Sequence, residues 1–79
     1  MLSLAEIARH RTVTIVRVDG PRRFRRRLLE MGLTPGSAVR VLNVPTVSVP
    51  LQLEVRHCRL SIRRREAEQI AVREEAKQP

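Results

Sequence analysis

The segment Arg27–Gly36 (RLLEMGLTPG) constrains the fold most, because it places a helix end directly before a tight turn. Gly32 stands where the residue after a helix commonly adopts a left-handed backbone conformation. Pro35 and Gly36 fit the two central positions of a type II turn, whose third residue requires a positive φ. We therefore predict structural roles for Gly32, Pro35 and Gly36, which turn the chain out of a helix and into a strand.

The residues before and within this segment predict the helix itself, over about residues 21–31. Pro21 suits a helix start, because the N–H that proline lacks is not needed there. An apolar stripe at helical spacing would pack on a sheet. This stripe consists of Phe24, Leu28 and Met31. Glu30 lies within reach of both Arg26 and Arg27 for an ion pair on the helix surface.

Most of the remaining chain alternates apolar and polar residues, a pattern that predicts strands. The expected strands are Thr12–Val18, Ala38–Val44, Leu51–Val55, a segment containing Leu60 and Ile62, and Ile70–Val72. Ser3 and Glu6 have the spacing of a capping box, which predicts a short helix ending at about Ala8. We also expect a loop at 45–50, a hairpin turn at 56–59 and a helical turn at 64–69. Five short strands with little helix predict a mainly β fold, a small and partly open barrel.

The length of the chain, 79 residues, leaves room for one domain with one core. Phe24 is the only aromatic residue, so aliphatic side chains must form that core. We expect the domain to span residues 1–73. The charged residues 74–79 are expected to form a frayed tail.

A single cysteine, Cys58, excludes an internal disulfide and a cysteine-rich zinc site, and one reduced thiol suits the cytosol. The N-terminal segment Met1–Ala8 lacks the basic and apolar regions of a signal peptide. No apolar stretch approaches the roughly 20 residues that span a bilayer. We expect a cytoplasmic protein without direct membrane insertion, which reaches a membrane through a partner.

The net charge of +8 comes from fifteen arginines and one lysine against eight acidic residues. Such a balance indicates an anionic partner, either nucleic acid, acidic lipid or an acidic protein surface. The alternative is that the arginines form an ordinary solvated surface. The charge alone does not decide between them.

The segment Arg27–Gly36, followed by a strand at Val39–Leu42, resembles the signature of the FeoA family. The second half of the chain, Leu51–Arg56 and Leu60–Val72, is similar to the later strands of that family. The resemblance implies a five-stranded SH3-like barrel and an accessory role in bacterial ferrous iron uptake. The implied partner is FeoB, an inner-membrane Fe²⁺ transporter with a cytoplasmic GTP-binding domain. It also implies a distant relation to the SH3-like domain of iron-dependent repressors.

Two segments depart from the family pattern. The loop Val44–Pro50 lacks the usual Gly-Asp pair and is one residue longer. The hairpin turn at Arg56–Cys58 lacks the glycine that is common there, so it must avoid positive φ or bear its cost.

Enzyme chemistry is not expected, because a nucleophile needs a base within reach and a third group that orients it. His57 and Cys58 are the only pair to consider, and neighbouring strand residues point to opposite faces. The weak candidates for metal ligands are His10, Glu54, His57 and Cys58. None of them has the spacing that holds ligands ready, so any metal site would be adventitious or shared between chains of an oligomer. We expect no cofactor.

The best candidates for partner contact are exposed cationic and apolar residues. They are Arg22, Arg23, Arg26, Leu29, Val47 and Val49. Arginine forms bidentate bonds to carboxylates, which fits an acidic face of a GTP-binding domain. A competing hypothesis is a small basic nucleic-acid-binding barrel. The sequence argues against it, because Phe24 is assigned to the core and no aromatic residue is left for stacking on bases.

Overall fold

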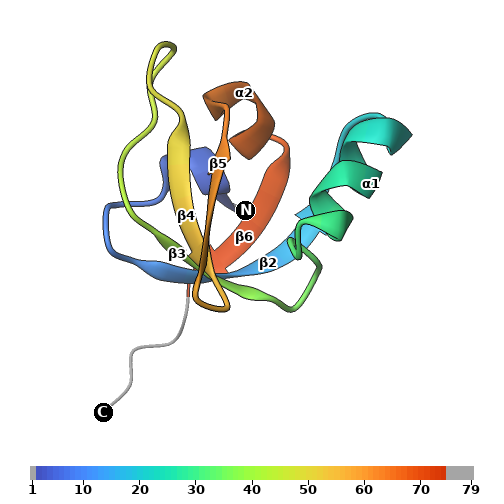
Figure 1. Ribbon diagram of the computed structural model, residues 1–79, viewed down its shortest axis with the longest axis horizontal. Coiled ribbons are helices and arrows are strands. Elements are labelled where there is room, and N and C mark those ends of the chain that lie inside the picture. Colours follow the sequence, from blue (N-terminus) through green and yellow to red (C-terminus); the bar gives the residue numbers. More distant parts are fainter. Residues whose placement is uncertain (1, 75–79) are drawn as a thin grey trace.

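A computed structural model describes residues 2–74 as one curved, six-stranded antiparallel sheet in the order β1-β6-β2-β3-β4-β5. The elements are β1 (Leu2–Ser3), the 3-10 helix η1 (Leu4–Glu6), β2 (Thr12–Val18), α1 (Arg22–Glu30), β3 (Ala38–Val41), β4 (Leu51–Val55), β5 (Cys58–Ile62), α2 (Arg64–Ala67) and β6 (Ile70–Glu74). The sheet curls around the core, and α1 projects from it on one side (Figure 1). None of the helices in residues 2–74 is long and apolar enough to cross a lipid bilayer.

The mainly β fold is confirmed, and the sheet is open, as a partly open barrel requires, but the predicted number of five strands is wrong. The sheet has a sixth strand, and within residues 2–74 no pairing between β1 and β5 closes it. The additional strand is β1, in which Leu2 pairs with Val72 and Ser3 pairs with Ala71. This pairing joins distant parts of the sequence, so no local pattern reveals it.

The predicted N-terminal helix is a single 3-10 turn that ends at Glu6 rather than Ala8. Ser3 is extended (φ −95°, ψ 159°), which allows it to end β1 and start the turn at once. Its backbone N–H donates to Glu6 Oε1 at 2.7 Å. This hydrogen bond to the charged carboxylate lowers the pKa of Glu6.

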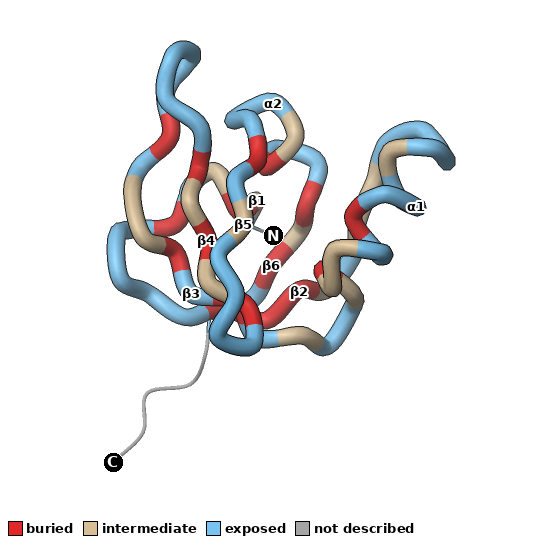
Figure 2. Tube along the Cα trace, in the orientation of Figure 1, coloured by how far each residue is buried: buried red, intermediate tan, exposed pale blue. Residues whose placement is uncertain are grey.

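The core consists of aliphatic side chains from every strand except β1, together with others from the helices and the connecting segments (Figure 2). Strands β3 and β4 show the expected alternation, with inward residues buried. Strand β2 does not, because Thr14 is buried between Val13 and Ile15 instead of facing solvent. This strand lies centrally in the sheet, and its register against β6 shifts at Val16, which forms a bulge.

Several element ends differ from the prediction. Strand β3 ends at Val41 and not at Val44. Beyond it, the side chain of Asn43 donates to Pro50 O (3.0 Å) and accepts from the Gln52 N–H (2.7 Å). Side-chain hydrogen bonds therefore take the place of backbone pairing at this point. Strand β6 includes Glu74, which pairs with Val13. The rest of the predicted tail lies outside the described residues.

The turn between β4 and β5 contains only two residues, Arg56 and His57, because β5 already starts at Cys58. Both have positive φ, 51° and 70°. This is the pattern of a type I′ hairpin turn, which normally contains asparagine or glycine. The turn bears the cost of positive φ rather than avoiding it.

Candidate partner-binding groove

The C-terminal end of α1 is a Schellman motif that fixes where the helix stops. The Gly32 N–H donates to Leu29 O at 3.0 Å, and the Leu33 N–H donates to Leu28 O at 2.9 Å. Gly32 has φ +91°, as predicted. Leu28 and Leu33 are both fully buried, which is the apolar contact typical of this motif. Leu33 lies outside the apolar stripe that was predicted to pack on the sheet.

The turn that follows is also confirmed and leads the chain back along β2. The Ser37 N–H donates to Thr34 O at 2.9 Å, and Gly36 has φ +93°. The Gly36 N–H donates to Ile15 O at 2.7 Å. Pro35 is thereby held beside β2 and near the helix.

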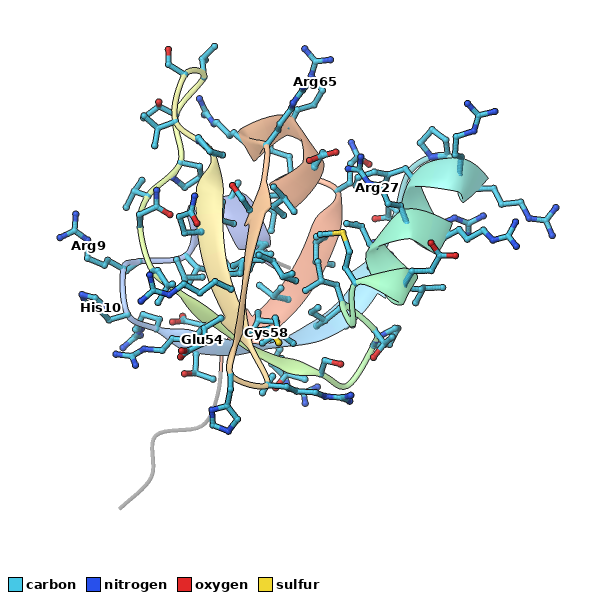
Figure 3. All side chains as sticks on the ribbon, in the orientation of Figure 1. Arg9, His10, Arg27, Glu54, Cys58 and Arg65 are labelled. Atoms are coloured by element: carbon cyan, nitrogen blue, oxygen red, sulfur yellow. The ribbon has the colours of Figure 1, made fainter. Side chains whose placement is uncertain are left out.

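Helix α1 is held to the rest of the molecule by its apolar stripe and by one ion pair. Leu28 is buried, and Phe24 and Met31 pack against the core. Arg27 pairs with Glu66 of α2 rather than with Glu30, toward which the helical spacing had pointed (Figure 3). The Glu66 carboxylate also accepts the backbone N–H of Arg63 at 2.8 Å. The ion pair therefore links two helices that lie far apart in the sequence.

A groove runs between α1 and β2, with an apolar floor and arginines along its rim. Val16 and Val18 enter it from β2, and Leu29, 46% exposed, enters it from α1. The bulge at Val16 belongs to this stretch of β2. The complete lining consists of Val16, Arg17, Val18, Arg22, Arg25, Arg26, Leu29 and Pro35.

The groove is positively charged, because four arginines and no acidic residue line it. Arg17 is neutralised by bonds of 2.8 and 3.2 Å to Asp19, and Arg26 has a loose contact of 3.9 Å with Glu30. Arg22 and Arg25 have no ion pair within residues 2–74. Exposed guanidinium groups beside an apolar floor suit an acidic segment that also carries an apolar side chain.

The structure brings together three of the six predicted contact residues, Arg22, Arg26 and Leu29. Arg23 does not line the groove. Val47 and Val49 lie on the separate loop at residues 44–50.

Two arginines of this groove, Arg17 and Arg25, are not among the predicted contact residues. Arg25 could have been found, because Arg22, Arg25, Arg26 and Leu29 follow the i, i+3, i+4, i+7 spacing of one helix face. Arg17 comes from another element and gave no such signal.

The candidate metal ligands do not converge. Among residues 2–74, no group of three His, Cys, Asp or Glu side chains could hold a metal ion. His10 lies in the turn before β2, where its N–H donates to Val41 O at 2.6 Å. Glu54 is paired in register with Arg40 on one side and Arg59 on the other. His57 and Cys58 are exposed at the β4–β5 hairpin, and Figure 3 shows His10 pointing outward beside Arg9.

Comparison with known proteins identifies relatives over the described part of the chain. The sequence matches the FeoA domain family over residues 2–74. No curated protein matches the sequence.

Solved structures that are similar in both sequence and fold include three FeoA proteins. The crystal structure of an iron uptake regulatory protein, FeoA, is 28% identical with a TM-score of 0.85, covering 94% of this chain and 97% of that one. The solution structure of FeoA from Chlorobium tepidum is 28% identical with a TM-score of 0.86, covering 99% and 74%. A zinc complex of FeoA from Stenotrophomonas maltophilia, described as a procaryotic SH3 domain protein, is 26% identical with a TM-score of 0.77, covering 92% and 91%.

Proposed function

The chain belongs to the FeoA family, and from this premise we propose that it is a cytoplasmic accessory protein that binds a FeoB-type transporter and modulates Fe²⁺ uptake. Family membership implies involvement in ferrous iron transport. The Stenotrophomonas relative has itself been put forward as a ferrous iron transport activating factor. In this proposal the chain acts through protein contact, without catalysis and without a cofactor of its own.

The groove between α1 and β2 is the observation that supports this proposal. Arg22 and Arg25 are exposed and have no ion pair within residues 2–74, so they are free to bind carboxylates of a partner. Leu29 lies one further turn along the same face and offers an apolar contact. An acidic segment of the transporter's cytoplasmic GTP-binding domain is the complementary surface, because bidentate guanidinium–carboxylate pairs combine charge with fixed geometry.

The nucleic-acid hypothesis is less well supported by the same surface. Single-strand binders combine positive charge with aromatic side chains on which bases stack. Phe24 is the only aromatic residue of the sequence, and it packs against the core. A phosphate backbone has no apolar group that could pack on the apolar floor beside the arginines, whereas an apolar side chain of a protein segment can pack there.

The proposal is tested by titrating the purified chain against the transporter's cytoplasmic domain and against the intact transporter in nanodiscs, with calorimetry as the readout. Leu29→Ser should weaken binding about tenfold, because a central apolar contact is lost. Arg22→Gln with Arg25→Gln should weaken it by a similar factor and reduce its salt dependence.

The matched control is Arg9→Gln with Arg40→Gln, which removes the same charge from exposed positions outside the groove. It should change the affinity less than twofold. Absence of saturable binding to both forms of the transporter would contradict the proposal. An equal loss in the control pair would show that net charge, and not the groove, determines binding.

A further inference from the structure

A second exposed surface, separate from the groove, is formed by the loop at residues 44–50 and the neighbouring helix α2. Loop and helix rise from the same end of the molecule (Figure 1) and line one open depression of about 500 Å³. We call this surface the loop pole. Its lining consists of Thr46, Val47, Ser48, Pro50, Arg63, Arg64, Arg65 and Glu68.

The loop is held in a defined shape although it projects from the sheet. Thr46 Oγ1 accepts hydrogen bonds from the backbone N–H groups of Ser48 (3.2 Å) and Val49 (2.9 Å). The Thr46 N–H donates to Val49 O at 2.9 Å, which closes the turn. At its base, the Asn43 side chain donates to Pro50 O and accepts from the Gln52 N–H, which ties the start of the loop to the segment entering β4. The loop tip is therefore preorganised.

The preorganised tip exposes apolar side chains instead of polar ones. Val47 is 92% exposed, and Val44 and Val49 are 56% and 47% exposed. No charged residue occurs between positions 44 and 50. Exposure of three valine side chains to water is unfavourable in free energy, whereas their transfer to an apolar environment is favourable.

Beside this tip lie cations that the fold does not neutralise. Arg64 has a 3.6 Å contact with Glu68, but Arg63 and Arg65 have no ion pair within residues 2–74. Arg65 points outward from α2 at the same end of the molecule (Figure 3). The loop pole thus combines a projecting loop tip that is apolar with the guanidinium groups of Arg63 and Arg65, unpaired within the described residues, which lie across the depression from it.

We propose that the loop pole binds the surface of an anionic lipid bilayer, with the valine tip among the headgroups and Arg63 and Arg65 on lipid phosphates. A convex tip inserts into a soft surface, and a basic rim at the depth of the phosphates adds electrostatic attraction. This contact lies on the membrane and does not span it. It departs from the expectation that the chain reaches a membrane only through a partner, and it does not depend on the proposed function.

Sedimentation with vesicles tests the proposal, using 70% phosphatidylcholine with 30% phosphatidylglycerol against pure phosphatidylcholine. Wild type should bind the anionic vesicles and not the neutral ones. Val47→Asp should weaken binding about tenfold, because the apolar tip is lost and a repelled charge is added. Arg63→Gln with Arg65→Gln should weaken it about 25-fold, at about fivefold for each arginine.

The charge-matched control is again Arg9→Gln with Arg40→Gln, which should retain nearly all of the binding. Unchanged melting temperatures verify folding of each variant. An independent readout is Val47→Trp, because the sequence contains no tryptophan and this residue becomes the sole indole emitter. Its fluorescence should shift to the blue with anionic vesicles only.

Three results would overturn the proposal. The first is absence of binding to anionic vesicles. The second is equal weakening by the loop-pole pair and the control pair, which would indicate net charge alone. The third is loss of transporter binding in the loop-pole variants without loss of vesicle binding, which would make this surface a protein contact. Because vesicles contain no protein, failure here leaves the transporter titration unaffected.

Discussion

The chain reverses after helix α1 and again between β4 and β5, and both reversals need positive φ. At the first, glycine occupies both positions, Gly32 at +91° and Gly36 at +93°. At the second, two residues with side chains, Arg56 at 51° and His57 at 70°, adopt the same region. Residues with a Cβ are strained there, whereas glycine is not.

The difference shows two ways of specifying a turn. After α1 the residue types themselves determine the conformation, so the turn is visible in the sequence. At the hairpin, the pairing of β4 with β5 sets the register, from Leu51 opposite Ile62 to Val55 opposite Cys58. Only two residues remain to connect the strands, and the turn follows from the sheet around it.

The largest expected effect is at the first reversal. Gly32→Val should reduce the free energy of unfolding by about 2 kcal/mol, because a β-branched residue strongly resists this φ. A Cβ at this position would lie 4.0 Å from Val55 Cγ1, so the cost is conformational and not a clash. Urea denaturation measures it, and Gly32→Ala should cost less. An unchanged stability in Gly32→Val would refute the role of Gly32.

The second reversal should respond in the opposite direction. Replacing Arg56-His57 by Asn-Gly should increase the free energy of unfolding by about 1 kcal/mol, since these residues adopt positive φ with little strain. Thermal unfolding gives the comparison, with Arg59→Gln on the neighbouring strand as a control for lost charge. If the Asn-Gly variant is no more stable, the sheet does not strain the native turn.

A smaller effect is expected from Arg27, whose substitution tests whether a side-chain ion pair stabilises the first reversal. Arg27→Gln removes the ion pair with Glu66 and should cost about 0.5 kcal/mol, because Arg27 is largely exposed and the pair is screened by salt. The loss should shrink at high ionic strength. A cost close to that of Gly32→Val would show that this ion pair, and not the backbone motif, holds the helix end.

The smallest expected effect on stability is at Glu6. Unlike the effects at the two turns, it should depend on pH. The pKa of Glu6 is lowered by the Ser3 N–H, so its contribution is present above the ordinary carboxyl pKa and is lost as the pH falls through the lowered value. Glu6→Gln should be slightly less stable than wild type at pH 7 and equal to it in strong acid. The deficit of Gly32→Val should persist across that range. Unfolding curves at several pH values give both comparisons.

Much of the fold could be predicted because the relevant signals are local. The bounds of Thr12–Val18 and Leu51–Val55 are those predicted, since alternation and turn residues mark them. The pairing of β1 with β6 and the burial of Thr14 could not be predicted, because both depend on what lies beside the strand in space.

The candidate groove divides in the same way. Its helical half follows from the spacing of Arg22, Arg25, Arg26 and Leu29 in the sequence. Its other half, Arg17 and the bulge at Val16, comes from a strand whose position beside the helix emerges only in three dimensions.

The exposed thiol at the start of β5 has a practical consequence. Cys58 is the only cysteine in the sequence and lines neither the groove nor the loop pole. A nitroxide or fluorophore can therefore be attached to the native protein without removing other cysteines. Placed directly after the strained hairpin turn, it would report the tumbling of the whole domain when a transporter or a vesicle binds elsewhere.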